Sequence, residues 1–348
     1  MANMRHEKLK VCYIVPEIAE DASTHFEHKR EIIQELRGDI EFFVYAPTLI
    51  SIVKIKFAYF FRGVRIFYVH YSFKGALVAI LLTKLFGGRV FYWNCGMPWL
   101  YKRGWLEEKL FRFILRNSIF VTGTNSLAEH YADRYGLDRA RVRVVPNYIR
   151  VSHMQGITRD SARRELEIPS GKKVVLFLHR LSRRKGAHFL PDILKEFAIR
   201  EDVLFLIVGD GPERTNTELR VTSYELQNRV RFEGNVPNNR VPIYFAAADV
   251  FLMPSEEEGM PNALLEAMAA GVPFVASDVG GVREMTPPSL HEYVLPQGDV
   301  AAFAEKIKKL LGDEELREKI SQEERGWVKR YDVSVAASAF LALLREGD

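Results

Sequence analysis

Short apolar runs alternate with amphipathic stretches along the whole chain. Runs of strand length are predicted in the first half at residues 9–15, 40–45, 64–70, 89–93, 121–122 and 142–145. Helices are predicted between them at residues 25–36, 75–86 and 100–117, with another beginning at Asn125. A chain that alternates strands and helices in this way builds parallel sheets covered by helices.

The second half repeats the alternation. Its strands are predicted at residues 173–178, 203–208, 230–232, 248–253 and 272–277, and its helices at 159–166, 262–270, 301–311, 314–325 and 333–345. A length of 348 residues suits about two domains. The predicted fold class is therefore α/β, with two facing Rossmann-like domains that each contain a parallel sheet. Neither half contains G-x-G-x-x-G followed by an acidic residue, which argues against a dinucleotide-dependent dehydrogenase.

Candidate chemistry concentrates where the strand of residues 248–253 ends. An acidic loop follows the strand, and Pro261 then suits the first turn of the helix predicted at 262–270. A helix N-terminus placed at the carboxyl end of a strand attracts anions, because its first N–H groups are unpaired and its dipole is positive there. This stretch therefore predicts an anion-binding site.

Two carboxylates flank this helix N-terminus. Glu258 lies in the acidic loop, and Glu266 lies about one turn into the helix, pointing back over its first turn. A diphosphate at the helix end could then meet sugar hydroxyls held by both acids. On spacing alone, a solvated acidic loop followed by a surface glutamate is an equally good interpretation.

The whole segment resembles the donor-site signature of retaining glycosyltransferase family four, the glycosyl transferases group 1 of GT-B fold. The family's Glu-x7-Glu pair matches Glu258 and Glu266, inside PS-x-x-EG-x-P-x-x-x-x-EAMA-x-G-x-P-x-V-x-x-x-x-GG. The resemblance is clear over residues 140–330 and weaker before them. It implies that residues 1–148 bind the acceptor, with residues 332–348 packing back onto them, and that residues 149–331 bind a nucleotide sugar.

The resemblance also implies roles for individual residues. Arg180 and Lys185, in HRLSRRKG, match the basic pair that holds the donor diphosphate, although a basic loop by itself is usually only solvated. Glu258 would bind the transferred sugar and Glu266 the ribose hydroxyls. Further donor-binding residues are expected around the helix N-terminus, beside the site and in the loop that cradles the base, namely Gly259, Met260, Pro261, Asn262, Ala263, Gly209 and Val236.

The acceptor side departs from the family pattern. A histidine that the family often carries near the reacting sugar is replaced by Asn94 and Cys95. Asn94, His70 or His25 could substitute for it, although each of them also suits a purely structural role. The loop after the first strand lacks the family's two glycines and leads instead into Thr24, a further acceptor-side candidate.

The implied reaction is transfer of a sugar from a nucleotide diphosphate, with UDP expected, to an acceptor hydroxyl with retention of configuration. The resemblance implies no metal and no cofactor, since Arg180, Lys185 and the helix N-terminus would meet the charge of the leaving diphosphate. The leaving phosphate would take the proton of the acceptor, so no protein nucleophile is required. Two alternatives remain open. One is a non-catalytic GT-B partner subunit that keeps the nucleotide site, and the other is a sugar phosphorylase-like enzyme on the same fold.

Charge adds a prediction about the surface on which the protein works. The net charge is only +4, but residues 42–106 contain nine Lys or Arg and no acidic residue, with aromatic residues between them. This pattern, continued by a basic helix at residues 100–117, predicts docking on an anionic membrane and a lipid-linked or cell-envelope glycan as acceptor. A basic face that serves solubility or binds a soluble anionic acceptor is the alternative. No nucleic-acid partner is expected.

Cysteine content and the N-terminus bear on the compartment. Two cysteines argue for a reducing environment, and the apolar run near the N-terminus is too short for a signal peptide. We therefore expect a cytoplasmic protein that associates peripherally with the inner face of the membrane.

Overall fold

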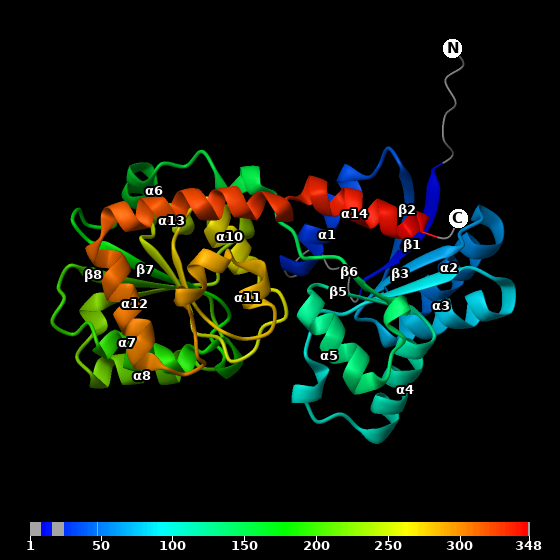
Figure 1. The fold of residues 1–348 in the computed structure, drawn as a ribbon, viewed down its shortest axis with the longest axis horizontal. Coiled ribbons are helices and arrows are strands. Elements are labelled where there is room, and N and C mark those ends of the chain that lie inside the picture. Colours follow the sequence, from blue (N-terminus) through cyan, green and yellow to red (C-terminus); the bar gives the residue numbers. More distant parts are fainter. Residues whose placement is uncertain (1–7, 16–23, 47, 347–348) are drawn as a thin grey trace, which may run out of the picture. The chain divides into compact units, whose positions relative to one another are not determined.

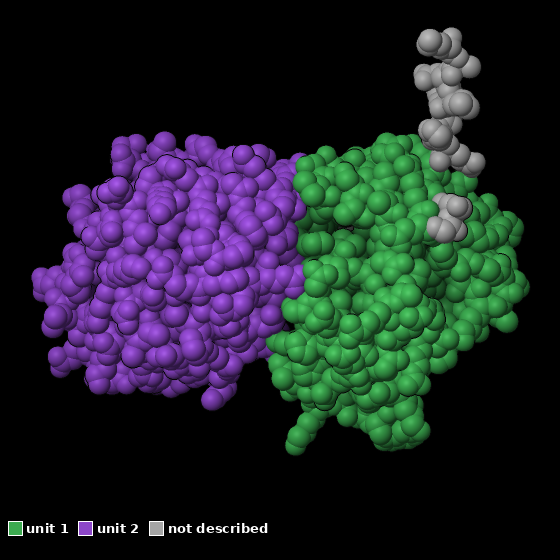
Figure 2. Space-filling model, viewed as in Figure 1, with its two compact units in different colours: residues 1–148, 333–348 green, residues 149–332 purple. Residues whose placement is uncertain are grey.

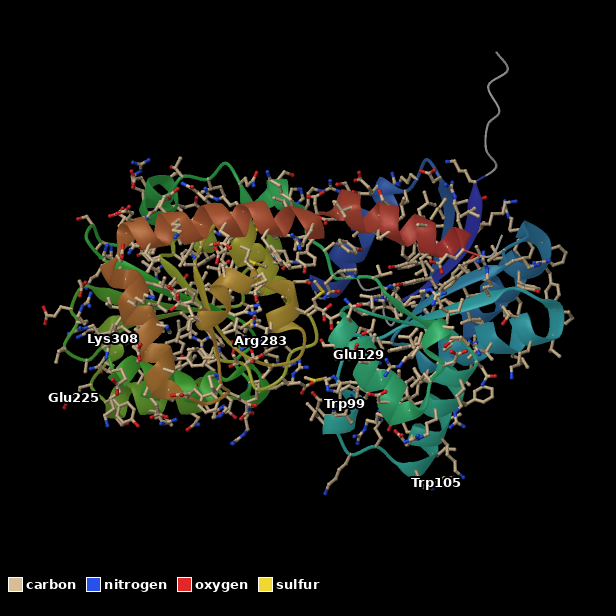
Figure 3. All side chains as sticks on the ribbon, in the orientation of Figure 1. Trp99, Trp105, Glu129, Glu225, Arg283 and Lys308 are labelled. Carbon is tan, nitrogen blue, oxygen red and sulfur yellow. The ribbon has the colours of Figure 1, made fainter. Side chains whose placement is uncertain are left out.

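Two α/β units make up the chain (Figure 1). The computed structural model describes residues 8–15, 24–46 and 48–346, with the side chains of residues 24–29 and 49 left out. One unit contains residues 1–148 and 333–348, and the other contains residues 149–332 (Figure 2). In each unit, apolar side chains fill the space between a parallel sheet and the helices around it (Figure 3).

The first unit is built on a six-stranded parallel sheet in the order β2-β1-β3-β4-β5-β6. Its strands are β1 (Leu9–Ile14), β2 (Ile40–Tyr45), β3 (Ile66–His70), β4 (Arg89–Trp93), β5 (Ile119–Thr122) and β6 (Val142–Val144). Its helices are α1 (Thr24–Glu35), α2 (Leu49–Arg62), α3 (Phe73–Phe86), α4 (Trp105–Arg116), α5 (Asn125–Tyr135) and α14 (Val333–Arg345). Strands β3 and β4 are buried almost throughout, as expected for a sheet covered on both faces.

Helix α14, at the end of the chain, packs on the sheet of the first unit. Its Phe340 ring meets the edge of Tyr68 at a centroid distance of 4.7 Å, and its Leu343 and Leu344 are buried. The Arg89 guanidinium donates a hydrogen bond to the Leu344 carbonyl at 2.9 Å, which satisfies a carbonyl that the helix end leaves open.

The second unit also has a six-stranded parallel sheet, in the order β12-β11-β10-β7-β8-β9. Its strands are β7 (Lys173–Leu178), β8 (Val203–Val208), β9 (Val230–Gly234), β10 (Val250–Met253), β11 (Phe274–Ser277) and β12 (Val294–Leu295). Its helices are α6 (Arg159–Glu165), α7 (Leu190–Lys195), α8 (Arg214–Ser223), α9 (Val241–Ala247), α10 (Asn262–Ala270), α11 (Val282–Met285), α12 (Val300–Gly312) and α13 (Glu314–Trp327).

The strand order places a topological switch point between β7 and β10. The chain runs outward from β7 through β8 to β9, and then returns to pair β10 with the other side of β7. The connections that leave β7 and β10 therefore go in opposite directions and open a crevice at the carboxyl ends of these two strands. Ligands of open α/β sheets bind in this crevice.

Helix α10, which lies next to this crevice, forms for local reasons that the sequence shows. Its nine residues are mostly Ala, Leu and Met, which are good helix formers, and six of them are buried. Gly271 ends the helix in the left-handed conformation at φ 70°. A Cβ atom at this position would lie 2.3 Å from side-chain atoms of Ser321 and Arg325 on α13, so a larger residue would force these side chains to move.

Helix α2 was not predicted from the sequence. Its residues, LISIVKIKFAYFFR, are apolar on two opposite sides of the helix, and many are β-branched or aromatic, so no single apolar stripe marks a helix. The signals that were available lie at its ends, where the Thr48 hydroxyl caps Ser51 N–H and Gly63 adopts φ 73°. The helix predicted from residue 100 is also shorter than expected, because α4 begins only at Trp105. Helices α7, α8, α9 and α11 and strand β12 had not been predicted either.

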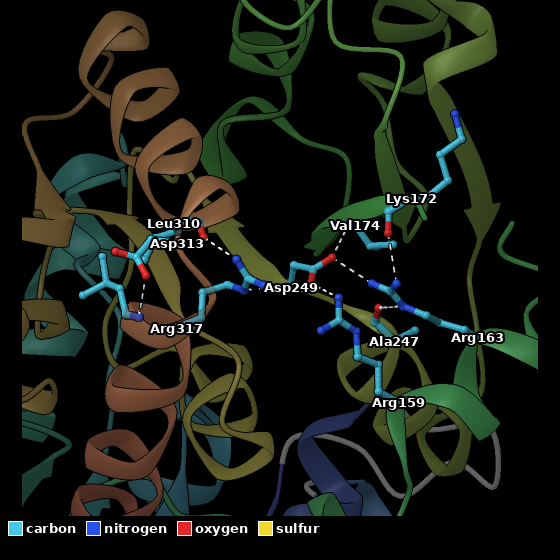
Figure 4. Close-up of polar contacts among 10 residues, drawn as sticks. Arg159, Arg163, Lys172, Val174, Ala247, Asp249, Leu310, Asp313 and Arg317 are labelled. Atoms are coloured by element: carbon cyan, nitrogen blue, oxygen red, sulfur yellow. Dashed lines mark hydrogen bonds and ion pairs between the residues drawn. The ribbon is translucent and has the colours of Figure 1, made fainter. Parts of the chain in front are cut away.

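A buried carboxylate ties together the amino ends of β7 and β10 (Figure 4). Asp249, directly before β10, accepts hydrogen bonds from Val174 N–H of β7 at 2.6 Å and from Arg163 of α6 at 2.7 Å. Arg159 donates to its other oxygen, and Arg317 of α13 lies 4.0 Å away. A buried charge costs several kcal/mol unless it is paired in this way, so the cluster fixes α6 against both strands.

We expect the Asp249→Ala substitution to lower the free energy of unfolding by about 3 kcal/mol, because it leaves the Arg163 charge and the Val174 N–H without their buried partner. Urea titration of the full chain measures this loss. Asp202→Ala is the matched control, since Asp202 forms a solvent-exposed pair with Arg200 at 2.7 Å and such pairs contribute less than about 1 kcal/mol. Equal losses in the two variants would contradict a structural role for the buried cluster.

Candidate active site

Two loops meet at the carboxyl ends of β7 and β10. The loop after β7 contains a short 3-10 turn, η4 (Arg183–Lys185), and the loop after β10 runs from Pro254 to Pro261. The N–H groups of Glu256 and Glu257 both donate to the Arg184 carbonyl, at 2.9 and 3.2 Å. This pairing of the two backbones holds the loops in one fixed arrangement.

Gly186 allows this close approach of the two loops. It has φ 73°, and a Cβ atom there would lie 1.9 Å from the Pro254 carbonyl oxygen. The position therefore requires glycine both for its backbone conformation and for lack of space. Gly186, which follows Lys185 in HRLSRRKG, is therefore required by the local packing of the two loops.

Glu258 is the buried charge at the centre of this arrangement. Its side chain is only 5% exposed, and the Lys185 Nζ lies 2.6 and 2.7 Å from its two carboxylate oxygens. The Ser255 hydroxyl donates a further hydrogen bond to Oε1 at 2.8 Å. Burial by itself would raise the pKa of the Glu258 carboxyl, but the Lys185 charge and these hydrogen bonds outweigh it and lower the pKa below its ordinary value. Glu258 is therefore an ionised hydrogen-bond acceptor.

His179 lies beside this pair and is kept neutral. Its Nε2 is 4.0 Å from Glu258 Oε1, too far for a hydrogen bond, and has no hydrogen-bond partner among the described residues. Burial, followed by the nearby charge of Lys185, lowers the pKa of His179 to about 3. An uncharged imidazole leaves Lys185 as the cation that faces Glu258.

The two glycines after β11 support the Glu258 loop from another side. Gly281 N–H donates to the Gly259 carbonyl at 2.9 Å. A Cβ atom on Gly280 would lie 1.6 Å from the Glu258 carbonyl oxygen, so no other residue fits there. The GG that closes the donor signature thus holds the backbone of Glu258 and Gly259 in place.

The N-terminus of α10 opens next to this loop. Pro261 occupies its N-cap position, and no side chain of a described residue caps the helix, so its first-turn N–H groups can serve an external anion. Asn262 has a buried Oδ1 without a hydrogen-bond partner in the described part of the chain. Met260 and Ala263 are buried beside it, and Glu266 is half-buried one turn further along.

The remaining donor-side candidates lie around the same crevice. Arg180, in the loop after β7, is exposed, and its guanidinium forms no hydrogen bond or ion pair with any described residue. Gly209, directly after β8, has φ 123°, and a Cβ atom there would lie 2.1 Å from the His179 carbonyl oxygen. Val236 is half-buried in the loop after β9. The structure thus brings Lys185 and Glu258 into contact and places the other candidates on neighbouring strand ends.

The acceptor-side candidates in the first unit are engaged in internal bonds. His70, at the end of β3, shares a 2.7 Å hydrogen bond between its Nε2 and the Tyr13 hydroxyl. Asn94, after β4, accepts a hydrogen bond from Gly96 N–H at 2.9 Å in a tight turn. The loop of residues 16–23 and the side chains of Thr24 and His25 lie outside the described residues.

Three features of the donor and acceptor sides were not predicted from the sequence. The place of Ser255 three residues before Glu258 in PS-x-x-EG suits the hydrogen bond that the structure shows. The burial of His179 has no sequence signal. Tyr71, after β3, has φ 51°, a conformation that costs energy for a non-glycine residue and that concentrates at ligand sites.

Comparison with known proteins finds related sequences and related folds. Residues 158–327 match the family model described as glycosyl transferases group 1. The second unit of the chain therefore resembles the group 1 glycosyl transferases. A curated relative is the 2-deoxystreptamine N-acetyl-D-glucosaminyltransferase of Niallia circulans, 33% identical over 151 residues, which are 43% of this chain and 39% of that protein. The alignments span about half of the length of the first curated relatives, 39% to 54%.

Solved structures of GT-B glycosyltransferases share the fold over nearly the full chain, which confirms the predicted fold class. Sucrose-phosphate synthase from Thermosynechococcus elongatus has a TM-score of 0.81 at 21% identity and covers 97% of this chain and 99% of its own. The Anabaena protein HepE in complex with UDP and glucose has a TM-score of 0.79 at 18% identity, with coverages of 97% and 99%. The residues that resemble the family signature thus lie at the switch point of the second sheet.

The low pKa of His179 predicts a pH dependence of stability. The unfolded histidine binds a proton below its ordinary pKa of 6.5, whereas the folded one does so only near 3, so stability is lost as the pH falls between these values. At pH 5, about 1.5 units below the unfolded value, the loss is about 2 kcal/mol. We expect His179→Gln to lack this part of the decrease between pH 7 and pH 5 in urea titrations. Parallel curves for the variant and the wild-type protein would contradict a buried neutral His179.

Proposed function

We propose that this protein is a retaining glycosyltransferase that moves a sugar from a UDP-sugar to an acceptor hydroxyl. The observation that carries the proposal is the Lys185–Glu258 pair, held at the switch point of the second sheet beside the open N-terminus of α10. The family match over the same residues and the UDP complex of a protein with the same fold support it. A nucleotide diphosphate offers the two negative charges that a cation and a helix N-terminus together bind.

The ion pair suggests how the site responds to the donor. Both carboxylate oxygens of Glu258 face Lys185, so each charge of the pair has a partner within the protein. A donor diphosphate offers Lys185 a stronger anionic partner, and the hydroxyls of the transferred sugar can then donate to the ionised Glu258. The Arg180 guanidinium, which has no partner among the described residues, is available to the same phosphates.

Charge stabilisation at the diphosphate would then supply most of the catalysis. Negative charge develops on the leaving phosphate in the transition state, where Lys185, Arg180 and the α10 N-terminus would oppose it. The leaving phosphate would take the proton of the acceptor on the same face of the sugar. No metal and no cofactor take part in this scheme. Glu258 is held by Lys185 and Ser255, which suits an acceptor of hydrogen bonds rather than an attacking nucleophile.

A non-catalytic nucleotide-binding subunit is the second candidate. The observation in its favour is that Asn94 replaces the expected histidine and already accepts a hydrogen bond from Gly96. Release of UDP from a panel of UDP-sugars by the purified protein separates the two. A phosphorylase-like enzyme would instead consume inorganic phosphate. Binding itself can be followed by thermal shift, since a donor at 100 times its Kd stabilises a protein by about 2.7 kcal/mol.

The first unit would supply the acceptor site. We propose a lipid-linked or cell-envelope glycan as acceptor, reached at the inner, cytoplasmic face of a membrane. The acid-free stretch of residues 42–106 in the first unit supports this, because the cations it carries suit an anionic surface. A small soluble acceptor is the alternative, and transfer assays with soluble and lipid-linked acceptors distinguish them.

The two glutamates should differ in their effect. We expect Glu266→Gln to raise the Kd for the donor, because its partners would be the ribose hydroxyls, and Glu258→Gln mainly to lower kcat. Removing a buried, hydrogen-bonded charge costs about 2–5 kcal/mol, so an effect of 30-fold or more is expected for the buried Glu258 and a smaller one for the half-buried Glu266. Calorimetric titration gives Kd, and UDP release gives kcat. Glu318→Gln, at an exposed position of α13, serves as the control. Unchanged constants in both site variants would exclude this assignment.

Lys185 and Arg180 should bind the donor diphosphate in place of a metal ion. Lys185→Ala and Arg180→Ala are each expected to lose most UDP release, while EDTA leaves the wild-type activity intact. Arg183→Ala is the matched control in the same loop, since this exposed arginine pairs only loosely with Glu256 at 3.8 Å. Activity that disappears in EDTA and returns with Mg²⁺ or Mn²⁺ would show that a metal carries the charge.

A further inference from the structure

Helix α2 exposes a continuous apolar face to solvent. Its opposite side is buried through Ile55, Ala58 and Tyr59. The exposed side carries five large apolar residues at helical spacing, Ile50, Val53, Phe57, Phe60 and Phe61, of which Ile50 is 71% and Phe61 75% exposed. A helix that carries apolar residues on two opposite sides is normally covered on both by protein or lipid.

Helix α3 extends this face. The Phe60 ring meets the edge of Phe86, in the last turn of α3, at a centroid distance of 5.2 Å. Leu81 and Leu85 of α3 are also exposed, at 61% and 63%. We call these eight residues of α2 and α3 the apolar helix face: Ile50, Val53, Phe57, Phe60, Phe61, Leu81, Leu85 and Phe86. Contiguous exposed patches of this kind mark interaction sites.

Positive charges border the apolar helix face. Lys54 and Lys56 are exposed on α2, and at about 100° per residue they fall on the two opposite edges of its apolar stripe. Arg62 ends α2, and Lys74 and Lys84 are exposed on α3. Neither helix contains an acidic residue. The face therefore combines apolar area with charges of a single sign.

Helix α4 adds exposed apolar residues beside α3. Phe113 lies 5.3 Å from the Lys84 ammonium in a cation–π contact, and Trp105 and Leu106 are exposed at the start of α4 (Figure 3). Some of the arginines in and before α4, which were expected to bind an anionic membrane, instead contact other residues of the protein. Arg112 pairs with Glu108 at 2.8 Å, and Arg103 lies over the Phe111 ring, 3.6 Å from Glu108. The basic side of α4 is therefore a weaker candidate for an anionic surface than α2 and α3.

We propose that the apolar helix face docks into the boundary between headgroups and acyl chains of an anionic lipid bilayer, with α2 lying in the plane of the membrane. The apolar residues would enter the acyl region, while the bordering lysines remain at the level of the phosphates. Helix α2 has 14 residues, a length of about 21 Å, which is shorter than the hydrocarbon core of about 30 Å. In the described part of the chain no helix is long and apolar enough to cross a membrane.

A bilayer fits this face better than a second copy of the chain. Two copies that met through α2 and α3 would place Lys54, Lys56, Arg62 and Lys84 of both close together, with no acidic residue of these helices to compensate them. Facing like charges oppose such an interface. An anionic lipid surface offers both the apolar interior and the opposite charge.

Two forces with different salt dependence would then hold the protein on the membrane. The lysine contribution is screened at about 1 M salt, where the Debye length is about 3 Å, whereas the burial of phenylalanine and leucine is not. The acid-free stretch alone would suggest a protein that salt removes. The exposed phenylalanines instead predict binding that needs anionic lipid to begin and then persists in part in high salt.

Flotation of the full chain with lipid vesicles tests the proposal. We expect wild-type protein to float with phosphatidylcholine vesicles that contain phosphatidylglycerol, and a fraction to remain bound at about 1 M NaCl. The double variant Phe57→Ser with Phe61→Ser should bind vesicles more weakly, by at least about tenfold for each ring removed, because burial of each ring in the acyl region favours binding. Lys54→Gln with Lys56→Gln should weaken binding about fivefold per charge at low salt only.

Matched controls keep the result interpretable. Ile199→Ser with Leu219→Ser removes exposed apolar residues from the second unit and should leave vesicle binding unchanged. All variants should keep the UDP release of the wild type without vesicles, so failure of membrane docking and failure of the transferase proposal can be told apart. Wild-type protein that ignores anionic vesicles overturns the proposal. So does a concentration-dependent dimer that Phe57→Ser with Phe61→Ser abolishes while vesicle binding stays unchanged, since the face would then join two copies.

Discussion

The ion pair between Lys185 and Glu258 is the constraint on which the candidate site depends. A carboxylate as buried as Glu258 is stable only with a partner, and Lys185 reaches it from a loop 73 residues earlier in the chain. Gly186 and Gly280 lack side chains because the backbones that carry this pair approach too closely for a Cβ atom. Motifs that look separate in the sequence, HRLSRRKG, PSEEEG and the later GG, thus describe one packed arrangement.

Buried charged residues link strands β7 and β10 at both of their ends. At their amino ends, Asp249 bonds Val174 of β7 and Arg163 of α6, and at their carboxyl ends Lys185 and Glu258 join the loops that leave β7 and β10. Each pairing satisfies charges that would be costly alone, so both edges resist separation of the two central strands. A donor site built between them inherits this rigidity, which is what precise charge stabilisation requires.

The sequence predicted the parts of the fold that local signals encode. Helix α10 was placed correctly because a proline, a run of helix formers and a terminal glycine act within a few residues. The neutral state of His179 could not be predicted, since it arises from burial by segments far apart in the chain. The same holds for Arg103 and Arg112, which were expected to face a membrane, because their contacts with Phe111 and Glu108 depend on how α4 packs.

The missed helix α2 and the exposed apolar helix face have one physical explanation. Sequence periodicity reveals a helix when one side meets apolar core and the other meets water. Helix α2 has core on one side, at Ile55, Ala58 and Tyr59, and carries phenylalanines on the other, so its pattern has no polar side to detect. If the exposed side of α2 meets lipid, both sides of the helix lie in an apolar environment. A sequence without apolar–polar periodicity is then what such a helix needs. The lysines at the borders of the stripe then mark where lipid gives way to water.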